Sequence, residues 1–141
     1  MDPELRQTYR DARAGGWTRV DMVIALLDGA LQRFQQAAER FEQQEVTGGA
    51  AHLLRGQRIV LELIAGLDLR YGELPKRLRD LYAYVLRLST ERHPAALAEA
   101  CKLLQTIREG FEGIRAEAQE LERRGEIPPP NDDTAALDAV S

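Results

Sequence analysis

Residues 20–41 read VDMVIALLDGALQRFQQAAERF, and this stretch decides the fold. Its apolar side chains recur at alternating spacings of four and three residues, which places them along one side of an α-helix. These side chains are Val20, Ile24, Leu27, Leu31, Phe34, Ala38 and Phe41. Such a seam is typical of a helix that packs nearly parallel or antiparallel to its neighbours. Thr18 and Asp21 form the pattern of a capping box, so we expect the helix to begin there.

Three more long helices are expected after this one. We predict them over residues 50–70, 73–92 and 94–124, because apolar residues recur there at spacings of three and four. Gly48-Gly49 is expected to end the first long helix. Short turns between long helices favour antiparallel neighbours. We therefore predict an all-α protein, an antiparallel up-down-up-down four-helix bundle.

The two ends of the chain are expected to lie outside this bundle. Residues 1–17 form an N-terminal segment, in which 4–14 are a weaker candidate for a short helix. Residues 18–124 make the bundle domain. Residues 125–141 contain three consecutive prolines followed by Asn-Asp-Asp, so we expect a disordered C-terminal tail.

Composition excludes several classes of partner. The 141 residues suit one domain, and the net charge of −4 comes without a concentrated basic stripe, so nucleic acid is not expected as a partner. The most apolar segment, residues 59–69, carries two carboxylates and is too short to span a bilayer. No targeting pattern stands at the start of the sequence, so we expect a cytoplasmic protein without a membrane partner.

No enzyme is indicated by the sequence. His52 and His93 are the only histidines, and neither stands in a metal-binding or catalytic motif. Cys101 is the single cysteine and lies within an apolar helical pattern. We therefore expect no catalytic residue, no metal site and no cofactor.

Several stretches resemble, in order and spacing, the flagellar secretion chaperone family FliS. Leu26–Ala30 (LLDGA) is similar to the family's Leu-Tyr-Asp-Gly-Ala signature, with leucine in place of the tyrosine. Further matching stretches are Gln57–Leu63 (QRIVLEL), Gly72–Leu74 (GEL), Leu81–Val85 (LYAYV) and Leu104–Phe111, where Phe111 stands in place of the family's tryptophan. The resemblance covers about residues 18–118.

The resemblance implies a cytosolic chaperone that binds the C-terminal segment of flagellin. It further implies that this binding prevents premature polymerisation, and that the flagellin is delivered to the flagellar type III export apparatus. In the family, the client lies in apolar grooves on the outside of the bundle, and an N-terminal tyrosine segment can lie over a groove that has no client. Tyr9 stands where such a covering tyrosine is expected.

The expected groove lies between the helices predicted over 50–70 and 73–92, which carry surplus apolar side chains. We expect it to be lined by Leu54, Ile59, Leu61, Ile64, Tyr71, Tyr82 and Leu86. Tyrosine suits such a surface because it joins a large apolar ring to a polar tip. The alternative for Tyr82 is a core position with a hydrogen-bonded hydroxyl group.

A second hypothesis for the whole chain is a generic helical-bundle adaptor or homodimerisation module with a partner other than flagellin. In that case the surplus apolar side chains would meet another copy of the chain. We expect a monomer or a weak homodimer.

Overall fold

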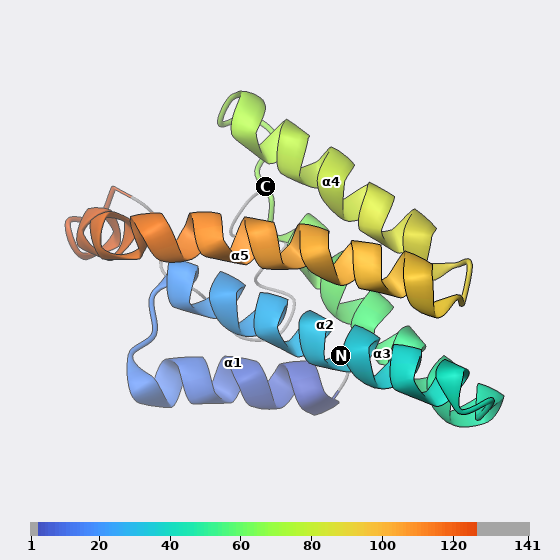
Figure 1. Ribbon diagram of the computed structural model, residues 1–141. Helices are drawn as coiled ribbons and strands as arrows, with labels where there is room; N and C mark the ends of the chain where they lie inside the picture. The colour runs from blue at the N-terminus through green and yellow to red at the C-terminus, as the bar shows by residue number, and fades with distance from the viewer. Residues whose placement is uncertain (1–2, 127–141) are drawn as a thin grey trace.

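The computed structural model describes residues 3–126, and within this range it consists of five α-helices and no strand. The helices are α1 (Pro3–Gly15), α2 (Arg19–Glu42), α3 (Val46–Ala65), α4 (Glu73–Ser89) and α5 (Pro94–Arg123). The all-helical class is confirmed. The antiparallel four-helix bundle is not confirmed, because the candidate helix over 4–14 forms as a fifth helix that packs against the others (Figure 1). Most of the predicted disordered tail, residues 125–141, lies outside the described residues.

Helix α2 begins where the sequence predicted. The Thr18 side chain accepts a hydrogen bond from the Asp21 backbone N–H, and the Asp21 carboxylate accepts one from the Thr18 backbone N–H at 2.8 Å. The other oxygen of this carboxylate contacts Arg115 at 2.6 Å and Gln119 at 3.0 Å, both on α5. Burial favours a raised pKa for Asp21, but these hydrogen bonds outweigh it and lower the pKa. The cap of α2 is therefore also a link between α2 and α5.

The turn between α2 and α3 comes earlier than predicted. Helix α2 ends at Glu42, and Gln44 adopts a left-handed conformation with φ of 61°. Gly48 and Gly49 consequently lie inside α3 instead of ending α2, so that prediction is wrong. Gly49 is required for space, because a Cβ atom there would lie 2.5 Å from the Phe41 ring.

A second glycine of α3 sets how closely α2 approaches. A Cβ atom at Gly56 would lie 2.7 Å from Cε1 of Phe34, which is fully buried. The predicted seam of α2 faces this contact, and its members from Val20 to Phe34 are all buried. The core between the helices also contains Val60, Val85, Leu97 and Leu104, each with no measurable exposure. Close packing of α2 on α3 therefore depends on small residues opposite aromatic rings.

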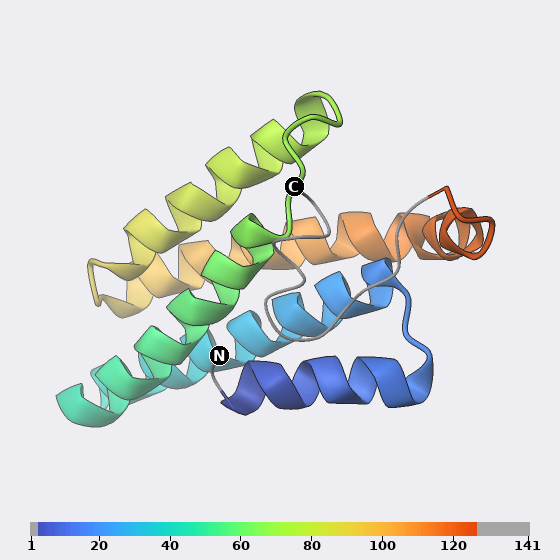
Figure 2. The ribbon, with the colours of Figure 1, turned by 180° about the vertical axis from the view of Figure 1, so that it is seen from behind.

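Helix α4 is much shorter than the helix it packs against. Its 17 residues span about 26 Å, whereas the 30 residues of α5 span about 45 Å. Figures 1 and 2 show that the first half of α4 diverges from the other helices, while its end stays next to the start of α5. The later half of α5 is therefore left without a helix over it on this side.

No helix between residues 3 and 126 has the length and apolar character needed to cross a membrane.

We predict that Gly56→Ala destabilises the protein. The added methyl group meets Phe34, which cannot move without opening the α2–α3 contact, so the cost of overpacking should be about 1–3 kcal/mol. Gly110→Ala is the matched control: Gly110 lies inside α5 with nothing within 4 Å of its would-be Cβ atom. That control should gain about 0.5–1 kcal/mol of helix propensity. Urea unfolding measures both; equal effects of the two substitutions would show that α2 and α3 are not in close contact at Gly56.

Candidate protein-binding groove

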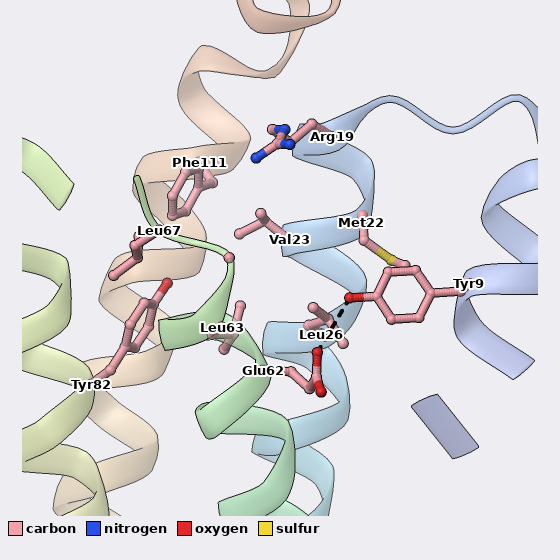
Figure 3. A pocket seen from close by; sticks show the side chains of 11 residues that line it. Tyr9, Arg19, Met22, Val23, Leu26, Glu62, Leu63, Leu67, Tyr82 and Phe111 are labelled. Atoms are coloured by element: carbon pink, nitrogen blue, oxygen red, sulfur yellow. Dashed lines mark hydrogen bonds between the residues drawn. The ribbon is translucent and has the colours of Figure 1, made fainter. Parts of the chain in front are cut away.

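Two adjoining hollows lie on one side of the helices. The larger, here called the outer groove, has a volume of about 390 Å³ and lies between the start of α2, the start of α4 and the later half of α5. The smaller, the inner cavity, has a volume of about 70 Å³ and lies mainly between α2 and the end of α3, with Tyr9 of α1 at one side (Figure 3). Both are lined by Arg19, Val23, Gly66, Leu67 and Phe111, so they form one continuous depression.

The outer groove is apolar along its floor and walls. Its apolar side chains come from three helices and the α3–α4 link, namely Val20, Val23, Leu67, Leu74, Leu78, Phe111 and Ile114. Leu74 is 60% exposed and Ile114 is 46% exposed. Water-exposed leucine and isoleucine side chains that face one hollow are the usual mark of a surface that binds an apolar partner.

Four charged residues also line the outer groove, and they are named here as its rim: Arg19, Asp68, Glu122 and Glu126. Asp68 is buried. The Arg19 backbone N–H donates to the Glu122 carboxylate at 2.7 Å, which joins the start of α2 to the end of α5. This hydrogen bond therefore holds together the two helices that supply most of the residues lining the groove.

The link between α3 and α4 fixes the angle at which α4 leaves. The Asp68 carboxylate accepts hydrogen bonds from the Arg70 guanidinium, the shortest at 2.7 Å, and from the Arg70 backbone N–H at 3.0 Å. These bonds lower the pKa of Asp68. Gly72 has φ of +94°, a conformation that residues with a side chain rarely adopt. This compact turn directs α4 away from α3 and opens the outer groove.

Helix α1 covers the inner cavity through Tyr9. Its hydroxyl group donates to the Glu62 carboxylate of α3 at 3.4 Å, and only 3% of the tyrosine is exposed (Figure 3). Burial raises the pKa of Tyr9, and the Glu62 carboxylate raises it further. Burial also raises the pKa of Glu62, despite the hydrogen bond that it accepts. A charged Glu62 is therefore less favourable under α1 than it would be in water.

Helix α1 is held by few contacts. Leu5, Tyr9 and Ala12 are its only buried residues in the described range, at spacings of four and three. A salt bridge between Glu4 and Arg33 of α2, at 3.1 Å, adds a partly exposed contact. A helix of 13 residues is marginal by itself in water, so α1 depends on these contacts to stay folded.

The residues predicted to line a groove do not lie together. Leu54 and Leu61 are exposed on α3, and Tyr71 is exposed at the outer groove. Ile64 and Leu86 are half-buried and pack against the core. Their part in partner binding remains a prediction.

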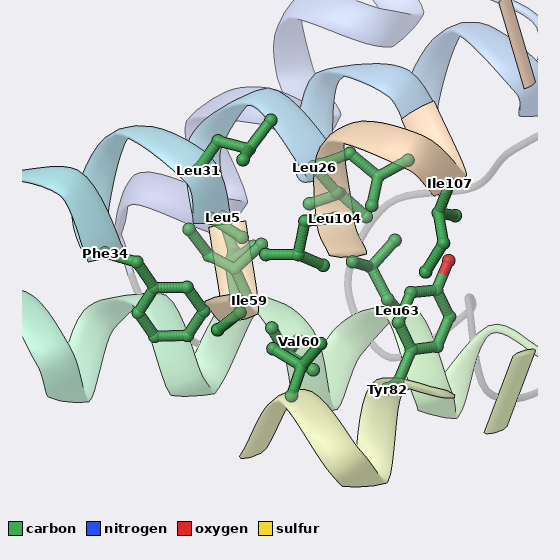
Figure 4. Close-up of a cluster of buried hydrophobic side chains, with 14 of the residues drawn as sticks. Leu5, Leu26, Leu31, Phe34, Ile59, Val60, Leu63, Tyr82, Leu104 and Ile107 are labelled. Atoms are coloured by element: carbon green, nitrogen blue, oxygen red, sulfur yellow. The ribbon is translucent and has the colours of Figure 1, made fainter. Parts of the chain in front are cut away.

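Two of the predicted residues are buried, which corrects their expected position on an open surface. Ile59 is 3% exposed and lies in the core (Figure 4). Its Cδ1 atom would lie 3.3 Å from a Cβ atom added at Gly29 of α2. Tyr82 is 1% exposed and lies at the floor of the inner cavity. Both side chains are covered by neighbouring helices, because Ile59 faces α2 and Tyr82 lies between α3 and α5 (Figure 4).

Sequence reasoning missed most of the outer groove. Val20 belongs to the predicted seam of residues 20–41, and Phe111 and Ile114 belong to the apolar pattern that predicts a helix over 94–124. A signal did exist, since the helix predicted over 73–92 is shorter than the one predicted over 94–124 and cannot cover its full length. The sequence did not say which end of the long helix would stay uncovered.

The two histidines and the cysteine lie in ordinary helical contacts. His52 lies 3.0 Å from the Arg33 guanidinium, and burial together with this cation lowers its pKa. His93 accepts a hydrogen bond from Ala95 N–H at the start of α5. Burial raises the pKa of Cys101 to about 11, so its thiol stays protonated at neutral pH. Within residues 3–126, no group of three or more His, Cys, Asp or Glu side chains could hold a metal ion.

The family model described as flagellar protein FliS matches residues 1–118. A search of curated protein sequences finds no match. The matched range contains α1 to α4 and most of α5, and it includes the inner cavity and much of the outer groove. The chain therefore belongs to the flagellar protein FliS family, whose members are export chaperones for flagellin and not enzymes.

Proposed function

We propose that this protein is a cytoplasmic export chaperone that binds the C-terminal segment of flagellin. Binding keeps that segment from polymerising before export and presents flagellin to the flagellar type III export apparatus. The observation that carries the proposal is the outer groove, an apolar depression in the surface of a member of this family. The client is an amphipathic segment whose apolar side chains enter the groove.

The energy of binding requires a client that spreads over more than this groove. Ordering about 20 residues costs roughly 30 kcal/mol, at ~1.5 kcal/mol for each residue. Offsetting that cost by apolar burial, at ~25 cal/mol per Å², takes about 1,200 Å² of contact. A hollow of about 390 Å³ holds only part of such a segment. The client therefore continues over other exposed apolar side chains.

The outer face of α3 offers a second contact. Leu54 and Leu61 are seven residues apart, so they lie on the same side of the helix, and they are 48% and 53% exposed. Tyr71 connects the two regions along the chain and lines the outer groove. These three residues are the part of the predicted binding set that is open to a partner. Ile64 and Leu86, which are half-buried, contribute at most their exposed edges.

Helix α1 acts as a cover that the client displaces. Tyr9 forms part of the wall of the inner cavity, which adjoins the outer groove at Leu67 and Phe111. Because α1 has only three buried residues, an entering client can replace its contacts at modest cost. The empty protein thereby hides part of its apolar surface from water and from other molecules.

The second candidate is an adaptor or homodimerisation module with a partner other than flagellin. Its support is the number of large apolar side chains left exposed, Leu54, Leu61, Leu74 and Ile114 among them, which would also suit contact with another copy. Light scattering separates the candidates, because a monomer at all concentrations disfavours self-association as the main role.

We predict that Leu74→Asp and Ile114→Asp each weaken binding of a C-terminal flagellin peptide from the same organism at least tenfold. Burying a leucine-sized side chain contributes about 1.5–3 kcal/mol, and 1.4 kcal/mol corresponds to a factor of ten. Calorimetric titration measures the affinity. Val46→Asp is the control, because Val46 is as exposed as Leu74 and lies at the far end of α3. An equal loss in the control, or no binding by the unaltered protein, would contradict the proposed site.

We predict that Tyr9→Ala strengthens binding of the same peptide. Removing the ring releases α1, so the client no longer competes with it. If α1 is docked in nine molecules of ten, the gain is about tenfold. Arg10→Ala changes the neighbouring exposed residue of α1 and should leave the affinity unchanged. An affinity that falls or stays constant in Tyr9→Ala would rule out a covering role.

Docking of α1 should depend on pH through Glu62. The docked state raises the pKa of this carboxyl group, so it holds the proton more tightly than the undocked state does. Docking is therefore weakest above the raised pKa and becomes stronger as the pH falls through it. Glu62→Gln removes the charge, keeps an oxygen acceptor for Tyr9, and should dock α1 firmly at pH 7.

Fluorescence of Trp17, the single tryptophan, reports on this equilibrium because Trp17 follows α1 directly. The signals of the unaltered protein and Glu62→Gln should differ at pH 7 and converge as the pH falls. His52 titrates in both proteins, so the difference between them isolates Glu62. Signals that already coincide at pH 7 would show that Glu62 does not control α1.

A further inference from the structure

We propose that the C-terminal segment of this chain, residues 127–141, binds in the outer groove of the same molecule and competes there with the client. The inference rests on the proposed function only in taking the outer groove as a binding surface. It is carried by the place where α5 ends, by the length of the segment, and by its sequence.

Helix α5 ends on the rim of the outer groove. The groove-lining residues of α5 follow one face of the helix, and Glu126 continues that line after the helix has ended; they are Phe111, Ile114, Ala118, Glu122 and Glu126. Gly125 has φ of +80° and its N–H donates to the Glu122 carbonyl group, while Glu126 N–H donates to the Leu121 carbonyl group at 3.0 Å. These two bonds form a Schellman motif, which stops the helix and sets a new chain direction at the rim.

The segment after Glu126 is long enough to return along the groove. The groove follows α5 from Phe111 to Glu122, which is about 17 Å at ~1.5 Å per residue. Residues 127–133 can span about 23 Å in extended form, at ~3.3 Å per residue. The three prolines at 128–130 favour an extended chain and lower the entropy cost of this return. Residues 134–141 can therefore reach every part of the groove.

The last eight residues, TAALDAVS, contain apolar side chains that suit an apolar groove. Leu137 and Val140 are three residues apart and fall on one side of a helical turn, with Ala136 beside them. The groove volume of about 390 Å³ lies in the range of about 300–1,000 Å³ that holds a small ligand, which suits the two larger side chains. We assign Leu137 and Val140 as the anchors.

Charge does not drive this contact. The rim has three carboxylates and one arginine, and the segment brings Asp132, Asp133 and Asp138. Docking therefore depends on apolar burial and should persist at high salt, which screens the repulsion. A tethered segment has an effective concentration in the millimolar range, so even weak intrinsic affinity keeps the groove occupied for much of the time. Such a segment is displaced by a client that binds more tightly.

The test uses the full chain with labelled methyl groups, observed by NMR. Leu137→Asp combined with Val140→Asp should shift the methyl signals of Val20, Val23, Leu74 and Ile114, and should leave those of Val46 in place. The control combines Ala135→Asp with Ala139→Asp, which adds the same charge on the opposite side of a helical turn. It should leave the groove signals unchanged. Groove signals that respond to neither variant, or to both equally, would overturn the proposal.

A second measurement asks whether the segment acts within one molecule. The labelled Leu137→Asp/Val140→Asp variant is mixed with an excess of unlabelled intact protein. Unchanged signals of the labelled groove support binding within one chain. A return of these signals to their positions in the intact protein would show exchange between copies and overturn the proposal.

Client binding then separates this inference from the proposed function. The Leu137→Asp/Val140→Asp variant should bind the flagellin peptide about three- to tenfold more tightly than the intact protein, because its groove is free. The NMR comparison needs no client, so its failure leaves the chaperone function standing. Conversely, groove signals that shift as expected in a protein without affinity for flagellin would keep this inference and reject the proposed client.

Discussion

The difference in length between α4 and α5 is the constraint on which the binding surface depends. Helix α4 has 17 residues and α5 has 30, so about 20 Å of α5 extends past its partner. Apolar side chains continue along that stretch through Phe111 and Ile114. The helices alone cannot bury them, and the turn at Asp68–Gly72 widens the opening by directing α4 outward.

An exposed apolar groove is a hazard for a protein on its own and an advantage for a chaperone. Helix α1 reduces the hazard by closing one side of the inner cavity with Tyr9, and this contact leaves the Glu62 carboxyl group partly buried. The balance is useful because a cover that binds too tightly would exclude the client. The proposed return of the C-terminal segment would protect the outer groove in the same way, from the opposite end of the chain.

Some features of the fold could be predicted because residues close together in the sequence determine them. The capping box of Thr18 and Asp21 and the buried seam of α2 are examples, since both follow from local hydrogen bonding and helical periodicity. The role of Gly48-Gly49 could not be predicted in this way. A glycine pair is typical of a helix end, but here Gly49 lies inside α3, where the Phe41 ring of α2 leaves no room for a side chain.

The sequence by itself determined the helical class, the start of α2, the mismatch in helix length and the resemblance to the FliS family. Only the tertiary structure decided which apolar side chains stay open. Leu74 and Ile114 are open, whereas Ile59 and Tyr82, which were expected to line a groove, are buried. The reason is geometric: periodicity tells which side of a helix is apolar, but the angle between two helices decides how far along that side the partner reaches.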